Sequence, residues 1–184
     1  MRYLLHLRRL ATCLLFLTPL LATATTVIPA SVEKITAKST DVVHARAIDS
    51  QSRWNPERTR IYTYTRFEVR RTLKGTAPNV ITVKQMGGSA GGYTQRVSGV
   101  QYWQPGEEAV LFLRPSSDRD GTLSITGVMQ GSFRLKRQPS GQVMVTNGVP
   151  YVSAFDAQTG STASYRGSRM TLQQLEDRVR KAVQ

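Results

Sequence analysis

The stretch TRIYTYTRFEVRR, Thr59–Arg71, decides the fold class of this 184-residue chain. Every second residue in it is apolar or carries a small hydroxyl: Ile61, Thr63, Thr65, Phe67 and Val69. The residues between them are aromatic or charged: Tyr62, Tyr64, Arg66, Glu68 and Arg70. Because side chains alternate between the two faces of a strand, this pattern predicts a β-strand with one buried and one half-exposed face.

Further short strands are expected on both sides of this stretch. The run Ala109–Leu113 is apolar on both faces, which is typical of a central strand. The other expected strands are Thr40–Asp49, Asn79–Gln85, Tyr93–Val100, Thr122–Val128, Ser132–Arg137 and Gln142–Thr146. We expect a polar loop at Ser50–Arg58 and a glycine-rich turn at Met86–Gly92. About eight short strands without alternating helices favour a barrel or a sandwich.

A helix is expected before the strands and another after them. The first spans Pro29–Ser39, has Ser31 as a candidate N-cap, and places on one face Ile28, Val32 and Ile35. The second spans residues 171–183 and begins with a capping box of Thr171 and Gln174. Its apolar stripe consists of Leu172, Leu175, Val179 and Val183.

Residues 1–24 have the three parts of a secretory signal peptide. Three arginines (Arg2, Arg8 and Arg9) precede the apolar run 14–21, and Ala22-Thr23-Ala24 fits the small-x-small cleavage rule. The apolar run is shorter than the roughly 20 residues that a spanning helix needs. We therefore expect cleavage, export to the periplasm or the cell exterior, and no stable membrane insertion afterwards. A retained N-terminal anchor is the alternative.

The remaining residues 25–184 are expected to form a single domain, because their number matches one domain by length. Its core is expected within residues 30–146, followed by a loose, Gly/Ser/Thr-rich segment at 147–168 and the C-terminal helix. Cleavage would remove Cys13, the only cysteine of the chain. An exported part without cysteine has neither disulfides nor a thiol nucleophile.

The exported part is strongly basic. It holds 22 Lys and Arg against 12 Asp and Glu, a formal charge of +10. Such a charge favours anionic partners, among them nucleic acid and acidic glycans. It is equally consistent with a charge that only keeps an exported β-protein soluble.

The sequence has few residues for catalysis or metal binding. The segment Gly87–Gly91 matches G-x-S-x-G, but a strand rather than a helix is expected after Ser89, and His44 precedes it. One histidine and no cysteine cannot form a zinc site without several carboxylates. Asp118 and Asp120, in an expected surface turn, are a weak signal for a hard cation. We therefore expect no catalytic residue, no metal and no cofactor.

The best candidate binding residues lie on the half-exposed face of the 59–71 strand. They are Tyr62, Tyr64, Arg66 and Arg70. Open β-surfaces hold single-stranded nucleic acid with such rings and cations. The same residues also suit a strand that only pairs with its neighbours, and we favour this interpretation because no recognition motif accompanies them. Trp54 and Trp103, near element ends, either cap the barrel or form a binding rim.

Several motifs resemble the opening of NTR/TIMP-like OB-fold modules: KSTDVVHARA at 38–47, TRFEV at 65–69 and LKG at 73–75. Four later motifs resemble an uncharacterised bacterial secreted family, whose domains occur alone or beside matrixin-like metalloproteases: GG at 87–88, VSGV at 97–100, PGEEAVLFL at 105–113 and GVMQGSF at 127–133. The resemblance covers about residues 30–146. It implies a mainly β, OB-like antiparallel barrel with a short N-terminal helix and a C-terminal helix, and a non-catalytic binding role.

One departure from these modules matters. TIMP-type inhibitors chelate the zinc of their target with an N-terminal cysteine, and the exported part of this chain has none. That mechanism therefore does not carry over to this chain.

Three functions follow, in order of preference. The first is an exported, non-enzymatic binding module for a protein, with association to a protease as one form of it. The second is the binding of an anionic polymer, nucleic acid or glycan, through the basic and aromatic surface. The third is a serine hydrolase that uses Ser89. The identity of the partner and the oligomeric state stay open at this point.

Overall fold

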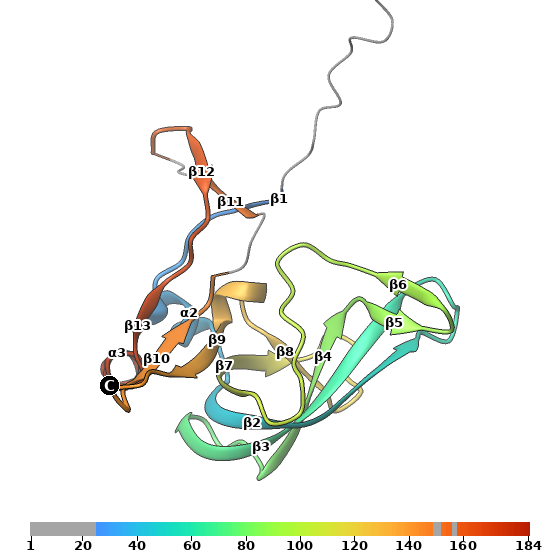
Figure 1. Cartoon of the computed structure of the whole chain (residues 1–184), viewed down its shortest axis with the longest axis horizontal. Helices are drawn as coiled ribbons and strands as arrows, with labels where there is room; N and C mark the ends of the chain where they lie inside the picture. Colours follow the sequence, from blue (N-terminus) through green and yellow to red (C-terminus); the bar gives the residue numbers. More distant parts are fainter. Residues whose placement is uncertain (1–24, 149–151, 156–157) are drawn as a thin grey trace, which may run out of the picture.

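The fold is a mainly β barrel with one helix before it and one after it in the chain. A computed structural model describes residues 25–148, 152–155 and 158–184, and the predicted signal peptide lies outside these residues. Five strands form a closed barrel, α2 (Val32–Lys38) precedes them and α3 (Leu172–Val183) lies at the C-terminal end (Figure 1). This confirms the expected OB-like barrel with terminal helices.

The strands of the barrel are not arranged in sequence order. Around the ring, the neighbours are β2 (Asp41–Trp54), β3 (Ile61–Lys74), β4 (Val80–Met86), β8 (Leu123–Ile125) and β7 (Glu108–Pro115), which pairs with β2 again. The β4–β8 pair is parallel, and the other four pairs are antiparallel. This is the Greek-key arrangement of a five-stranded OB-like barrel.

The predicted alternation along β3 fills the barrel. Ile61, Thr63, Thr65 and Phe67 are buried, whereas Tyr62, Tyr64 and Arg66 lie on the outer face. The barrel interior also holds Val43, Ala45, Ala47, Ile81, Val83, Trp103, Ala109, Leu111, Leu113 and Ile125. Burial of each large apolar side chain contributes about 1.5–3 kcal/mol, so the interior is a principal source of stability.

A second apolar core lies between the barrel and the two helices. It contains Val32, Ile35, Val42, Val110, Phe112, Phe133, Val145, Leu175 and Val179. Because β7 faces the barrel interior with one set of side chains and this second core with the other, its five apolar residues are all buried. The apolar run at 109–113 is therefore a central strand, as predicted.

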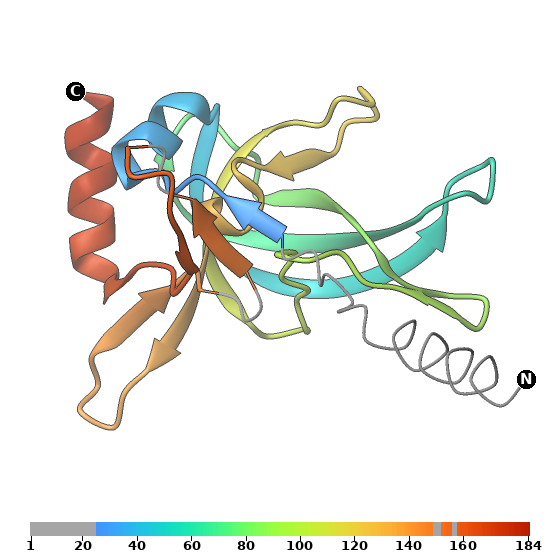
Figure 2. The same cartoon turned by 90° about the horizontal axis from the view of Figure 1, so that it is seen from above.

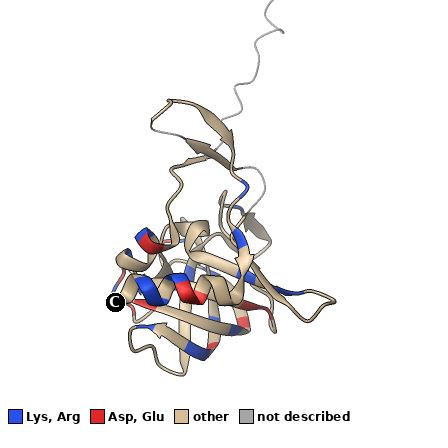
Figure 3. Cartoon of the chain, turned by 90° about the vertical axis from the view of Figure 1, so that its left-hand side faces the viewer, with Lys and Arg blue, Asp and Glu red and all other residues tan. Residues whose placement is uncertain are grey.

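Both helices begin at the predicted caps. The Ser31 hydroxyl accepts a hydrogen bond from the Lys34 amide, and Thr171 and Gln174 form a complete capping box. The Arg178 guanidinium on α3 donates two hydrogen bonds, of 2.7 and 2.9 Å, to the Glu33 carboxylate on α2. The face of α3 seen in Figure 3 carries charges of both signs. One expectation was wrong: Ile28 precedes α2 and is 63% exposed, because the helix starts only at Val32.

The length of β2 also differs from the expectation. We predicted a strand that ends at Asp49 and a loop at Ser50–Arg58, but β2 continues to Trp54, paired with β3. Polar cross-strand contacts replace apolar ones here, because Ser50 meets Thr65 at 3.0 Å and Ser52 meets Thr63 at 2.8 Å between hydroxyl oxygens. Together, β2 and β3 form a long ribbon that extends beyond the barrel (Figure 2). We call this extension the ribbon: residues 49–54 paired with 61–66.

A small hairpin lies against one face of the ribbon. It consists of β5 (Gly88–Ala90) and β6 (Tyr93–Gln95), where we expected a turn at 86–92 and a longer strand at 93–100. Gly88 has φ 125°, and a Cβ there would collide with the hydroxyls of Ser52 and Thr63. Only glycine therefore lets the hairpin approach this closely.

The region after β7 contains further strands and a short helix. The predicted hairpin is present as β9 (Ser132–Arg137) and β10 (Val143–Thr146), with β13 (Arg169–Thr171) beside it. The strand expected at 122–128 is shorter, because a 3-10 helix, η2 (Val128–Gly131), replaces its end.

The segment 147–168, which we expected to be loose, contains two strands within its described residues. They are β11 (Val152–Phe155) and β12 (Thr162–Ser164), and they form a three-stranded sheet with β1 (Thr25–Val27) that projects from the barrel (Figure 1). The β1–β11 pair joins segments that are far apart in the sequence. Local composition therefore does not reveal it.

Candidate functional site

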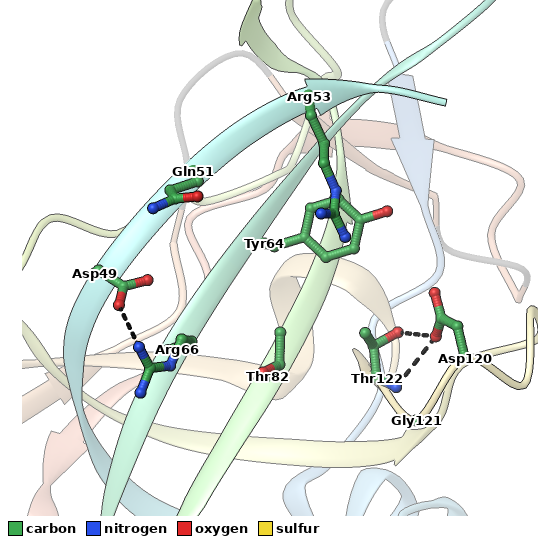
Figure 4. Close-up of a pocket in the computed structure, with 9 residues that line it drawn as sticks. All are labelled: Asp49, Gln51, Arg53, Tyr64, Arg66, Thr82, Asp120, Gly121 and Thr122. Atoms are coloured by element: carbon green, nitrogen blue, oxygen red, sulfur yellow. Dashed lines mark hydrogen bonds and ion pairs between the residues drawn. The ribbon is translucent and has the colours of Figure 1, made fainter. Parts of the chain in front are cut away.

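The candidate site is a groove on the outer face of β2, β3 and β4 (Figure 4). We call it the outer groove. It encloses about 440 Å³ and is lined by Asp49, Gln51, Arg53, Tyr64, Arg66, Thr82, Asp120, Gly121 and Thr122. Strand register explains its floor, because Gln51 lies opposite Tyr64 and Asp49 lies opposite Arg66. The loop between β7 and β8 supplies its far wall.

Cations cover the tyrosine rings of the groove. The centre of the Arg53 guanidinium lies 4.0 Å from the centroid of the Tyr64 ring. The Nζ atom of Lys84 lies 4.6 Å from the Tyr62 centroid and 5.5 Å from that of Tyr64. Each such contact contributes about 0.5–1 kcal/mol at an exposed site. Each ring therefore has a cation against it, and a stacking base would have to compete with that cation.

Lys84 is at the centre of an ion-pair network beside the groove. Its Nζ atom binds Asp118 and, at 3.1 Å, Asp120. Burial disfavours the charged ammonium, but the hydrogen bonds to Asp118 and Asp120 outweigh this effect and raise the pKa of Lys84. Hydrogen bonds from Thr122 and then Lys84 lower the pKa of Asp120 to about 2. The two carboxylates considered for a hard cation therefore hold an ammonium group.

The charged residues that line the outer groove, taken with the Lys84–Asp118 pair beside it, carry no net charge. Arg66 pairs with Asp49 at 3.0 Å. The cations are Arg53, Arg66 and Lys84, and the carboxylates are Asp49, Asp118 and Asp120. Three charges of each sign cancel. The basic excess of the chain therefore lies elsewhere.

The structure brings together three of the six predicted binding residues. Tyr62, Tyr64 and Arg66 lie on one face of β3; Tyr64 and Arg66 line the outer groove, and Tyr62 lies beside it against Lys84. Arg70 lies farther along β3 and pairs with Glu68 at 3.1 Å. Trp54 follows Ser50 and Ser52 in the alternation of β2, so it lies on the opposite face of the ribbon. Its ring meets Tyr93 edge-on at 5.7 Å between centroids.

Trp103 is a core residue, which corrects its assignment to a binding rim. Its side chain has no exposed surface. The Trp103 ring meets Phe67 edge-on at 5.9 Å between centroids. The centre of the Arg134 guanidinium lies 4.6 Å from the centroid of the Trp103 ring. Of the two roles considered, the structure therefore supports capping of the barrel, because the ring packs inside it against Phe67 and has no exposed face to offer to a ligand.

Sequence reasoning missed Asp49, Arg53 and Lys84. Continuing the two-residue alternation of β2 would have placed residues 49, 51 and 53 on the buried face of Val43, Ala45 and Ala47. A register shift between Ala47 and Asp49 turns them to the outer face instead, and no local pattern predicts that shift. Lys84 had no local signal either, because its acidic partners are 34 and 36 residues away in the sequence.

Ser89 lacks the surroundings of a hydrolase nucleophile. It is exposed in β5, and its Oγ atom lies 2.8 Å from that of Thr94. His44 pairs with Glu108 at 3.2 Å. The hairpin meets β2 at Ser52, eight residues from His44, which is roughly 26 Å at about 3.3 Å per residue. His44 therefore does not reach Ser89 to act as its base.

Among the residues that the structure describes, no three His, Cys, Asp or Glu side chains gather closely enough to hold a metal ion. None of the helices in this part is long and apolar enough to cross a membrane.

Comparisons with known proteins add no relative. No protein-family model matches the chain, and no curated protein matches it.

Proposed function

We propose that this protein is an exported, non-enzymatic binding module whose outer groove holds a segment of a partner protein. The observation that carries the proposal is the groove itself, a concave surface with a tyrosine floor and balanced, paired charges. Tyrosine and arginine are enriched in protein interfaces, where large rigid side chains bury area at low entropic cost.

The position of the groove supports a binding role. OB-fold barrels hold their ligands on the face of the second and third strands and on two loops beside it. In this barrel those strands are β3 and β4, and one of those loops is the β7–β8 connection. The outer groove lies on this face and against this loop.

The charge of the groove favours a polypeptide over an anionic polymer at this place. A polyanion gains affinity from cations that are free to neutralise it, but Arg66 and Lys84 are already paired with carboxylates. Stacking of bases needs open ring faces, and Arg53 and Lys84 cover the rings. A polypeptide can supply side chains of both signs and exchange partners with these pairs.

The wider context of the proposal rests on the sequence. The predicted signal peptide places the partner in the periplasm or outside the cell. The OB-like barrel with a helix before its first strand supports the proposed relation to NTR/TIMP-like modules, and association with a protease is the form of binding that this relation suggests. Without a cysteine in the exported part, such binding would need contacts other than zinc chelation.

Affinity capture from the envelope and culture-medium fractions of the source cell tests the proposal. The bait is the purified protein, and the comparison is a Tyr64→Ala/Arg53→Ala variant. Arg70→Ala is the matched control, because Arg70 is exposed on the same strand but lies outside the groove. We expect a specific protein to be retained by the wild type and the control, and to bind the groove variant at least about tenfold more weakly.

Two results would contradict the proposal. One is the absence of any specific protein under several salt conditions. The other is retention of the same protein by the groove variant with unchanged affinity, measured by calorimetry with the purified partner.

A further inference from the structure

A second cleft lies on the opposite face of the ribbon, and we propose that it binds an acidic oligosaccharide. We call it the inner cleft. It encloses about 870 Å³ between the inner face of the ribbon, the β5–β6 hairpin, the connection at 96–105 and the β9–β10 hairpin. That volume is large enough for several sugar units, given that drug-sized ligands occupy pockets of about 300–1,000 Å³.

The charge of the inner cleft is positive. Its wall contains Arg96, Arg134 and Lys136, and no Asp or Glu is among the described residues that line it. Arg96 and Lys136 are exposed. Within the described part of the chain, Arg134 is the one of these three cations that is paired with a carboxylate, that of Glu107 at 3.4 Å, and it also donates to the Tyr102 carbonyl at 2.9 Å. In contrast to the outer groove, this surface has cations to offer to an anionic ligand.

Hydroxyl and amide groups line the rest of the cleft. The inner face of the ribbon contributes Ser50, Ser52 and Thr63, because alternation sends these side chains opposite to Gln51, Arg53 and Tyr64. Further hydrogen-bonding side chains come from the hairpins and the 96–105 connection: Ser89, Thr94, Gln95, Ser98, Gln101, Gln104 and Thr146. Several of these hydroxyls already bond one another, as Ser52 does with Thr63 and Ser89 with Thr94. Each hydroxyl oxygen has two lone pairs, so the wall can accept hydrogen bonds from the hydroxyls that a sugar presents at short intervals.

Buried polar atoms in the wall have unused hydrogen-bonding capacity. Gln101 Oε1 and Arg134 Nε have no partner among the described residues, and both residues line the cleft. Gln101 is only 8% exposed. Buried polar groups without a partner are rare in native proteins, and they indicate places where a ligand or ordered water completes the structure.

The class of ligand follows from what the cleft lacks. Nucleic acid binding on an open surface relies on exposed rings that stack bases. Tyr102 and Trp103 are the aromatic residues among the described lining. Trp103 is fully buried, and Tyr102 is half-buried with its hydroxyl bonded to the Met86 carbonyl at 2.9 Å. Cations among hydroxyls, without a stacking platform, match a glycan whose carboxylate or sulfate groups meet the arginines and the lysine.

Equilibrium binding by the purified protein tests the inference. The probes are an oligogalacturonide, a sulfated heparin-derived oligosaccharide of equal length, a neutral cello-oligosaccharide and a single-stranded oligonucleotide of equal charge. We expect at least one acidic oligosaccharide to bind at least tenfold more tightly than the neutral one and the oligonucleotide. Its affinity should fall as salt rises from 50 to 200 mM, because the contacts are ionic. The two acidic probes separate carboxylate from sulfate recognition.

Variants locate the binding. Arg96→Ala/Lys136→Ala should weaken the acidic oligosaccharide at least tenfold, and because both side chains are exposed, its thermal unfolding should match that of the wild type. Arg53→Ala in the outer groove is the matched control and should leave the affinity unchanged. The inference is overturned if neither acidic probe binds, if the oligonucleotide binds as tightly, or if the cleft variant binds like the wild type. None of these results bears on protein binding at the outer groove.

Discussion

The two faces of the ribbon are made by the same two strands, yet they present different chemistry. On the outer face, Arg66 is paired with Asp49, and Lys84 on the neighbouring strand β4 is paired with Asp118 and Asp120. On the inner face, hydroxyls of Ser50, Ser52 and Thr63 continue into a cationic wall. Strand alternation alone separates these sets. The comparison shows that the unpaired positive charge of a basic protein can lie on a different surface from its exposed aromatic residues.

The largest expected change in stability comes from Trp103, which is buried in the barrel, and it contrasts with that from Trp54, which lies half-buried on the ribbon. Trp103→Ala should lower the free energy of unfolding by about 3–5 kcal/mol, because it empties the end of the barrel. Trp54→Ala should cost only about 1–2 kcal/mol, because Trp54 is half-buried on the ribbon. Urea unfolding followed by circular dichroism measures both. Equal costs would contradict the assignment of Trp103 to the core.

The next effect tests whether the hairpin shapes the inner cleft. Gly88→Ala should lower the free energy of unfolding by about 2–3 kcal/mol, because it combines a positive φ with a collision against Ser52 and Thr63. Gly92→Ala is the matched control, since Gly92 also has a positive φ but faces open space, and it should cost about 1 kcal/mol. Thermal unfolding of both variants checks this, and identical losses would show that the close approach is unimportant.

A smaller effect is expected when the network of the outer groove is opened. Lys84→Met should lower the free energy of unfolding by about 1–2 kcal/mol, because it removes two ion pairs and two contacts to tyrosine rings. It should leave acidic oligosaccharide affinity at the inner cleft unchanged. Arg70→Met, on β3 but outside the groove, should change the free energy of unfolding by no more than about 0.5 kcal/mol. A Lys84 variant as stable as the Arg70 variant would contradict the network.

The smallest effect is the pH dependence of the same network. The pKa of Asp120 falls from 3.8 to about 2 in the folded protein. Its ionised form therefore stabilises the fold above about pH 4, and this stabilisation is lost as pH falls from 4 through 2. For an exposed pair we expect about 0.5 kcal/mol. Urea titrations across this range should show a flatter pH dependence for Asp120→Asn, and an unchanged slope would count against the hydrogen bonds that Thr122 and Lys84 donate to this carboxylate.

The fold was readable from the sequence where the pattern is local. The alternation at 59–71 predicted β3, the apolar run at 109–113 predicted the central strand, and the capping box at Thr171 predicted the start of α3. These signals depend on neighbours within a few residues, so the sequence contains them directly. The extension of β2 to Trp54 lacks an apolar pattern and is specified by hydroxyl pairs with β3, which no local rule reveals.

The candidate sites were less predictable, because they depend on contacts between distant segments. Tyr62, Tyr64 and Arg66 were found by alternation alone, but nothing near Lys84 in the sequence shows that it meets Asp118 and Asp120. The inner cleft joins the ribbon to the 96–105 connection and to β9. Its cations come from separate parts of the chain, so the sequence showed only their total charge.

The central claim is that the two faces of the ribbon are separate binding surfaces, and fluorine NMR of the protein labelled with 3-fluorotyrosine tests it most directly. Tyr64 lines the outer groove and Tyr102 lines the inner cleft, and Tyr→Phe variants would assign their signals. During a titration with the acidic oligosaccharide, we predict that the Tyr102 signal shifts with saturation while those of Tyr62 and Tyr64 stay in place. Saturable shifts of Tyr62 and Tyr64 with an unmoved Tyr102 signal would contradict it.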